Sequence, residues 1–288
     1  SLAACGGKAK TAGGAKGSAM STDQEVTHKD GVITAGISYE LGTNGYDPMT
    51  TSSALTVAAN WHTLEGLTEL HPATREVYAA LASDMPKKVD DTTYEVALRK
   101  DAKFTDGSAV TADDVVFSFT RVLDPANKSL YSQFLPFIDK VEAKDASTVT
   151  IKLKYAFSLV AERLSVVKIV PKAIVEADAK AFDMNPTGSG PFKMTDNGAA
   201  SQKVVFERND NYNGPRPALA KSMTWQVLPD DTTRTNAMSS SSVQAIDAVP
   251  AANLTTLKDP VKVAAQQGFG LLFAMFNNTT FSNVKARQ

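Results

Sequence analysis

The sequence contains very little cysteine, histidine and tryptophan, with one, three and two residues respectively among 288. Because Cys5 is the only cysteine, an intrachain disulfide is excluded. The histidines, His28, His62 and His71, lie far apart and share no ligand spacing, so we predict no metal site and no cofactor. The longest apolar run, residues 271–276, is far too short to cross a bilayer.

An excess of one charge and the common catalytic motifs are also missing. The net charge is −1, and lysine and arginine are scattered along the chain, so we predict no nucleic-acid partner. No phosphate-binding Gly-x-x-x-x-Gly-Lys-Ser/Thr loop and no Gly-x-Ser-x-Gly nucleophile turn occur. Asp113 and Asp114 are the one carboxylate pair that invites a catalytic reading, but neighbours on a helix point about 100° apart. We therefore predict that the chain is not an enzyme.

What the sequence does contain is a clear strand–turn–helix pattern over residues 94–125. Alternating apolar residues over 94–98 predict a half-buried strand, and Asp106-Gly107 predicts a turn in which glycine supplies a positive φ. Thr111 is placed to cap a helix over 111–123, with acidic residues in its first turn. One apolar face of this helix is expected to be buried, and Pro125 to end it. Its residues are Val115, Val116, Phe119, Val122 and Leu123.

Similar patterns predict the other elements of an α/β protein of about two domains. We expect strands at 32–37, 149–153, 204–208, 224–228 and 271–277, and a further strand after Pro191. Helices are expected at 55–64, 158–164, 172–180 and 232–239. Asp230 and Asp231 are candidate caps for the last helix.

Residues 98–118 closely resemble the signature of the bacterial extracytoplasmic solute-binding proteins of ABC importers, family 5. The family pattern is Leu-Arg-x-x-x-x-Phe-x-Asp-Gly followed by Thr-Ala-x-Asp-Val-x-x-Ser, and this segment matches it throughout. Shorter motifs extend the resemblance in both directions. They are Tyr46-Asp47-Pro48, Leu64-Glu65-Gly66-Leu67, Gly188-Ser189-Gly190-Pro191-Phe192, Arg208-Asn209-Asp210-Asn211-Tyr212 and Phe276-Asn277-Asn278. Two positions depart from the pattern. The run 239–242 with Gln244 stands where the family has a Ser-Gly-x-x-Asp pattern, and Asn213 stands in place of a frequent aromatic residue, which is expected to weaken one packing contact.

The resemblance implies a fold as well as a family. It predicts a type II periplasmic-binding-protein fold, with a first lobe over 31–50 and 186–288 and an inserted accessory domain over 51–185. Family members continue well beyond the position of Gln288, so we expect this chain to be truncated and to lack the lobe that closes over the ligand. A single lobe contacts only one side of a ligand, so we expect the 288-residue form to bind peptides weakly or not at all.

The ligand site is implied by the resemblance alone. Peptide-binding relatives hold an extended peptide through backbone groups, which places the site here at Ser52, Ser53 and Ala54 and at Gly268, Phe269 and Gly270. Weaker candidates, for which packing is the simpler role, are Tyr46, Trp61 and His62. The implied partners are a peptide ligand and separate ABC permease and ATPase subunits. Nickel, haem or an oligosaccharide is the alternative ligand for the same fold.

Cys5 lies in a Leu-Ala-Ala-Cys-Gly sequence, the pattern of a bacterial lipobox. We predict acylation of this cysteine and anchoring on the extracytoplasmic face of the cell membrane. Residues 1–30, rich in glycine, alanine, serine and lysine, are predicted to form a flexible tether. A different class of function, a truncated surface lipoprotein used in signalling or interaction, is a second hypothesis at this point.

Overall fold

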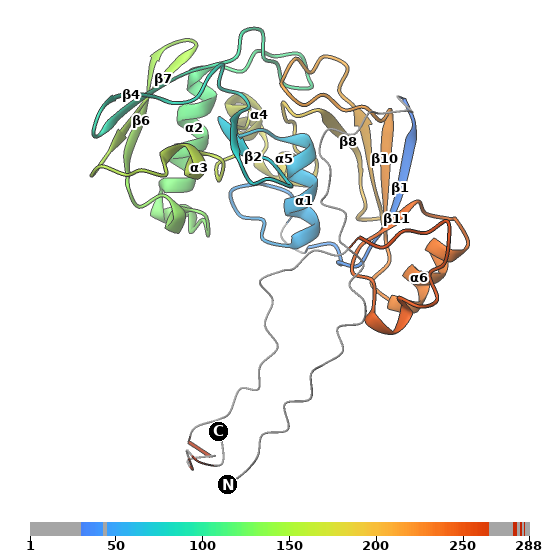
Figure 1. The fold of residues 1–288 in the computed structure, drawn as a ribbon. Helices are drawn as coiled ribbons and strands as arrows, with labels where there is room; N and C mark the ends of the chain where they lie inside the picture. The colour runs from blue at the N-terminus through green and yellow to red at the C-terminus, as the bar shows by residue number, and fades with distance from the viewer. Residues whose placement is uncertain (1–29, 43–44, 265–278, 281–282, 284, 286–288) are drawn as a thin grey trace.

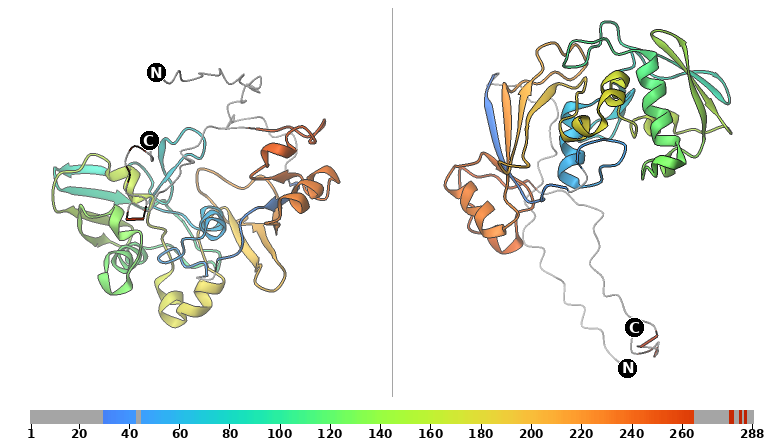
Figure 2. Two further views of the ribbon diagram at one scale, coloured as in Figure 1. Left: turned by 90° about the horizontal axis from the view of Figure 1, so that it is seen from below. Right: turned by 180° about the vertical axis from the view of Figure 1, so that it is seen from behind.

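A computed structural model of the protein describes residues 30–42, 45–264, 279–280, 283 and 285 (Figure 1). The tether predicted over 1–30, apart from Asp30, lies outside the described residues, as do Cys5 and the strand predicted at 271–277. In the described part of the chain, two sheets lie at opposite ends of the molecule with helices between them (Figures 1 and 2). None of the described helices has both the length and the apolar character needed to cross a bilayer.

The larger sheet combines segments that are far apart in the sequence. In spatial order its strands are β11 (Ala245–Ile246), β1 (Val32–Ile37), β10 (Ser222–Val227), β9 (Lys203–Arg208) and β8 (Phe192–Asn197). β1 runs parallel to β10 and β11, whereas β8, β9 and β10 are antiparallel neighbours. The chain therefore leaves this sheet after β1 and returns to it at β8.

The residues between β1 and β8 form a second, antiparallel sheet and a short hairpin. The second sheet has the order β4 (Lys87–Asp90), β5 (Thr93–Ala97), β7 (Thr148–Leu153) and β6 (Ile138–Asp145). The hairpin consists of β2 (Thr68–Leu70) and β3 (Val77–Ala79). A large apolar core that includes Phe104, Phe119 and Ile151 lies on this sheet, separate from the core of the larger sheet, which includes Phe206 and Trp225.

Helices cover both sheets. They are α1 (Ala54–Thr63), α2 (Ala112–Leu123), α3 (Val160–Leu164), α4 (Lys172–Ala177), α5 (Ala179–Met184) and α6 (Asp231–Ser239), with short 3₁₀ turns η1 (Pro125–Asn127), η2 (Ser132–Phe134) and η3 (Ala251–Asn253). α1 buries Leu55 and Ala59 in the core of the larger sheet, and Figure 1 shows it between the two sheets. The domain limits expected from the resemblance, 51–185 within 31–50 and 186–288, stay a prediction.

The strand–turn–helix pattern predicted from the sequence is confirmed in detail. Gly107 has a φ of +91°, and Thr111 caps α2 by accepting a hydrogen bond from the backbone N–H of Asp114. The Asp114 carboxylate accepts a hydrogen bond from the backbone N–H of Thr111 at 2.9 Å, which completes a capping box. Its other oxygen accepts from the backbone N–H of Lys172 at 2.9 Å, so Asp114 also fixes the start of α4. Of the carboxylate pair, Asp114 thus serves helix capping, and Asp113 lies in the first turn of α2.

One predicted helix is wrong in extent. The segment 172–180 forms two helices, α4 and α5, because Asp178 adopts a non-helical backbone conformation between them and caps the second. The Asp178 carboxylate accepts hydrogen bonds from the backbone N–H groups of Lys180 and Ala181. The strands β2, β3, β4, β6 and β11 are additions that the sequence patterns did not predict.

Candidate functional site

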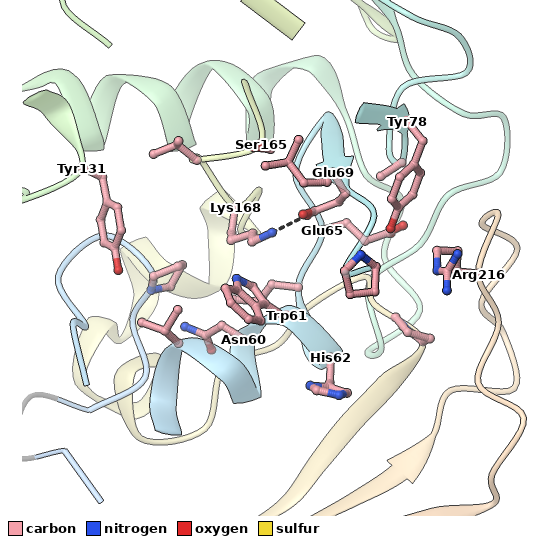
Figure 3. Close-up of a pocket in the computed structure, with 18 of the residues that line it drawn as sticks. Asn60, Trp61, His62, Glu65, Glu69, Tyr78, Tyr131, Ser165, Lys168 and Arg216 are labelled. Atoms are coloured by element: carbon pink, nitrogen blue, oxygen red, sulfur yellow. Dashed lines mark hydrogen bonds and ion pairs between the residues drawn. The ribbon is translucent and has the colours of Figure 1, made fainter. Parts of the chain in front are cut away.

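A pocket of about 630 Å³ lies where the two cores approach each other (Figure 3). Its walls come from the C-terminal half of α1, the β2–β3 hairpin, the η2 turn, the segment after α3, and residues 212–216. Small-molecule sites in proteins commonly measure about 300–1,000 Å³ and combine apolar walls with a few polar groups. The pocket therefore has the size and position of a ligand site.

The two tryptophans of the chain occupy opposite environments. Trp61 lines the pocket and is 62% exposed, whereas Trp225 is 6% exposed in the core of the larger sheet. Trp225 packs edge-on against Phe206, with ring centroids 4.8 Å apart. An exposed indole on a pocket wall offers a flat apolar surface to a ligand.

His62 follows Trp61 but serves mainly in packing. Its ring lies edge-on to Trp225 at 5.2 Å, and its Nδ1 is 2.7 Å from the carbonyl oxygen of Ala58. Burial lowers the pKa of His62, and the contact with Ala58 opposes this shift only partly. The imidazole is therefore neutral at pH 7, and it supplies no positive charge to the pocket.

Beneath the pocket, Glu65 is buried and receives four side-chain hydrogen bonds. Arg99 donates to its two carboxylate oxygens at 3.2 and 3.1 Å, Ser189 donates at 2.9 Å and Tyr212 at 3.0 Å. Burial raises the pKa of the Glu65 carboxyl, and the bonds from Arg99, Ser189 and Tyr212 oppose that shift. Arg99 also donates to the carbonyl oxygen of Ala80. This network fixes the floor of the pocket.

Asn213, where the sequence departs from the family pattern, belongs to the same hydrogen-bond network. Arg99 Nε donates to Asn213 Oδ1 at 2.9 Å, and Asn213 Nδ2 donates to the carbonyl oxygen of Lys100 at 2.9 Å. Asn213 thus holds the arginine that pairs with Glu65, a role different from the weakened packing contact expected from the sequence.

A second ion pair forms part of the pocket wall. Lys168 pairs with Glu69, and Glu69 also accepts a hydrogen bond from the backbone N–H of Gly66 at 2.7 Å (Figure 3). The side chain of Lys168 is only 8% exposed. Nearby, burial raises the pKa of Tyr78 to about 12, so its hydroxyl stays protonated and can donate a hydrogen bond.

Asn60 is the one described residue with a buried side-chain polar atom that lacks a partner. Its Nδ2 donates to the carbonyl oxygen of Tyr46 at 2.7 Å, but its Oδ1 accepts no hydrogen bond. Because Asn60 lines the pocket, a small shift of this side chain would present an acceptor to a ligand.

The site residues predicted from the sequence are only partly visible. Ser52, Ser53 and Ala54 lie at the start of α1, next to Thr51, which lines the pocket. Gly268, Phe269 and Gly270 lie outside the described residues. Of the weaker candidates, Trp61 and His62 line the pocket, whereas Tyr46 is buried and donates from its hydroxyl to the carbonyl oxygen of Asn197 at 2.7 Å.

Sequence reasoning missed the hydrogen-bonded residues that form the floor of the pocket. Each of these residues lies in a different motif of the same family pattern, and this was the signal that could have identified them. They are Glu65, Arg99, Ser189 and Tyr212. Within the described ranges, no group of three or more histidine, cysteine, aspartate or glutamate side chains could hold a metal ion.

Comparison with known proteins places this geometry in context. Residues 76–288 match the family described as bacterial extracellular solute-binding proteins, family 5 Middle. The chain is 33% identical to Protein XP55 of Streptomyces lividans over 163 residues, 55% of this chain and 29% of that protein. It is 29% identical to the glutathione-binding protein GsiB of Pectobacterium atrosepticum over 272 residues, 90% of this chain and 51% of that protein.

The fold is also found among solved structures. The oligopeptide-binding protein AppA of Bacillus subtilis, solved in complex with a nonapeptide, matches with a TM-score of 0.71 at 26% sequence identity. The match covers 79% of this chain and 46% of AppA. The fold is therefore the α/β fold of type II periplasmic binding proteins, and the chain spans about half or less of the curated relatives' length.

Proposed function

Because the chain belongs to the bacterial extracellular solute-binding proteins of family 5, we propose that it captures a solute outside the cell for an ABC importer. A permease and an ATPase, as separate subunits, would receive the solute. Ligand binding would shift an equilibrium between open and closed forms, and the closed form would dock on the permease. The family and relatives such as GsiB and AppA are named as binding proteins, in agreement with a role in binding rather than catalysis.

A peptide is the ligand that we propose. The observation that carries this choice is the 630 Å³ pocket with Trp61 exposed on its wall, in a chain that resembles a nonapeptide-binding protein. Ser53 and Trp61 are eight residues apart around α1, which corresponds to about 12 Å along a helix axis. An extended peptide of about four residues spans the same distance. One peptide could therefore contact the backbone at 52–54 and the indole of Trp61 together.

Two relatives are named for other ligands, and these ligands are the alternatives to a peptide. A nickel-binding periplasmic protein of Escherichia coli is 30% identical over 158 residues, and heme-binding protein A of Haemophilus influenzae is 29% identical over 250 residues. Calorimetry on the full-length gene product, with a mixed peptide pool, nickel, haem and maltotriose in parallel, distinguishes these ligands. We expect saturable binding of the peptides alone. Saturation by another of the probes without peptide binding would contradict the choice of ligand.

A substitution links the binding to the pocket. Trp61→Ala should weaken peptide binding, since it removes the exposed aromatic wall. Tyr155→Ala is the matched control, because Tyr155 is also a large exposed aromatic, at 49%, but does not line the pocket. Equal loss in both variants would place the ligand elsewhere. Anchoring through acylated Cys5 on the extracytoplasmic face of the membrane is part of the same proposal.

A further inference from the structure

Three arginines line the pocket without an ion-pair partner among the described residues. They are Arg75 in the β2–β3 hairpin, Arg163 in α3 and Arg216 after β9. The two carboxylates of the lining are already paired, Glu65 with Arg99 and Glu69 with Lys168. The positive charges of the three arginines are therefore not neutralised inside the pocket.

This local charge contrasts with the chain as a whole. The full sequence carries a net charge of −1, yet the pocket concentrates three uncompensated guanidinium groups beside apolar and aromatic walls. A cleft lined by one sign of charge and low-dielectric walls focuses the electrostatic field and raises the local concentration of oppositely charged solutes.

Two of the arginines lie at different ends of the pocket. The guanidinium of Arg163 lies 5.7 Å from the ring centroid of Phe134, which belongs to the η2 turn at one end. Arg216 is near Tyr78 at the other end, on the side of the pocket opposite Tyr131 (Figure 3). Arg75, from the loop that precedes β3, lines the pocket as well. A ligand that satisfies both ends needs anionic groups at two separate positions.

We propose that the pocket selects acidic peptides, in which one carboxylate meets Arg163 and another meets Arg216, with Arg75 adding to the positive charge of the lining. This inference rests on the proposed function, since a peptide supplies one carboxylate at its C-terminus and an acidic side chain supplies the other. Arginine binds carboxylates through paired, charge-assisted hydrogen bonds, which fixes their orientation as well as their charge. Trp61 then contacts the body of the peptide between the two ends.

The test compares two peptides that differ in charge alone, Ala-Glu-Ala and Ala-Gln-Ala, on the full-length gene product. One charge-assisted contact predicts about tenfold tighter binding of the glutamate peptide at low salt, with a smaller ratio at high salt. Arg163→Gln should reduce this preference, whereas Arg216→Gln, which removes the partner of the C-terminal carboxylate present in both peptides, should weaken the two peptides alike. Lys87→Gln, the same loss of charge on the exposed strand β4 and outside the pocket, should leave it unchanged.

A charge swap separates recognition from a merely structural role. Arg163→Glu should lose the preference for Ala-Glu-Ala and gain one for Ala-Lys-Ala, which a loss of folding cannot produce. Equal affinity for the glutamate and glutamine peptides in the native protein would overturn the acidic preference and leave the proposed function standing. Binding of neither peptide would overturn both, and displacement of Ala-Glu-Ala by inorganic phosphate at equal concentration would assign the arginines to free phosphate instead.

Discussion

Glu65 and Arg99 form a nearly buried ion pair, with nitrogen–oxygen distances of 3.1 and 3.2 Å, and it joins two sequence motifs that are 34 residues apart. The Glu65 side chain is 4% exposed and that of Arg99 is 14% exposed. Ser189 and Tyr212, from two further motifs, donate to the same carboxylate. The pair therefore holds the β2–β3 side of the pocket against the larger sheet.

Removing this carboxylate should destabilise the protein strongly. We expect Glu65→Ala to lower the free energy of unfolding by about 3 kcal/mol, because it leaves the Arg99 charge largely buried without its partner. Urea denaturation followed by circular dichroism measures the change. Glu142→Ala, which breaks the exposed pair between Lys140 and Glu142, is the control and should have little effect. Equal losses in the two variants would contradict a structural role for Glu65.

His62 should make stability depend on pH. Burial lowers its pKa in the native state below the ordinary value of 6.5, so between these two values the unfolded chain binds a proton that the native state does not. The free energy of unfolding should therefore fall as pH decreases below about 6.5. His62→Gln should flatten this slope, as measured by urea denaturation at several pH values.

The comparison variant for this experiment is His71→Gln, in the turn before β3. The slope is the informative quantity, since His62→Gln also loses the contact with Trp225 and so changes stability at every pH. A slope that His62→Gln leaves as steep as in the native protein would show that other groups cause the acid sensitivity.

The capping box of α2 offers a smaller, local test. Thr111→Ala removes the side chain that accepts from the backbone of Asp114 and should cost about 1 kcal/mol of stability. Thr120→Ala makes the same chemical change on the exposed side of the same helix, where alanine has the higher helix propensity, and should not destabilise. Thermal unfolding of the two variants side by side gives the comparison. A Thr111→Ala variant as stable as Thr120→Ala would contradict the capping role.

Much of the secondary structure was predictable because its causes are local. The alternation at 94–98, the turn glycine at 107 and the capping threonine at 111 each act within a few residues, and all three appear in the structure as expected. The break between α4 and α5 was missed because Asp178 lies inside a helix-like pattern, where only its non-helical backbone conformation reveals a second helix start.

The pocket was less predictable because it depends on long-range contacts. Ser189 and Tyr212 lie 124 and 147 residues from Glu65 in the sequence, and no periodic pattern links them. The three arginines without an ion-pair partner likewise come from separate segments. Arg75 and Arg163 precede the return of the chain to the larger sheet, and Arg216 follows it. Trp61 was named only as a weaker candidate, for which packing was the simpler role.

The proposed lipid anchor makes a separate prediction about Cys5. When cells are labelled with radioactive palmitate, the native protein should carry the label and sediment with membranes. Cys5→Ser, which removes the only sulfhydryl of the sequence, should abolish labelling and release the protein from the membrane fraction. An unlabelled native protein would contradict the acylation of Cys5.

The most direct test of solute capture is the fluorescence of Trp61 during titration with peptides. Trp61 is exposed on the pocket wall, whereas Trp225 is buried in the core and supplies a constant background. A bound peptide should shift the emission of the full-length gene product to shorter wavelength in a saturable way, and Trp61→Phe should lose the shift. A saturable shift that persists in Trp61→Phe, or calorimetric peptide binding without any change in Trp61 emission, would contradict binding in this pocket.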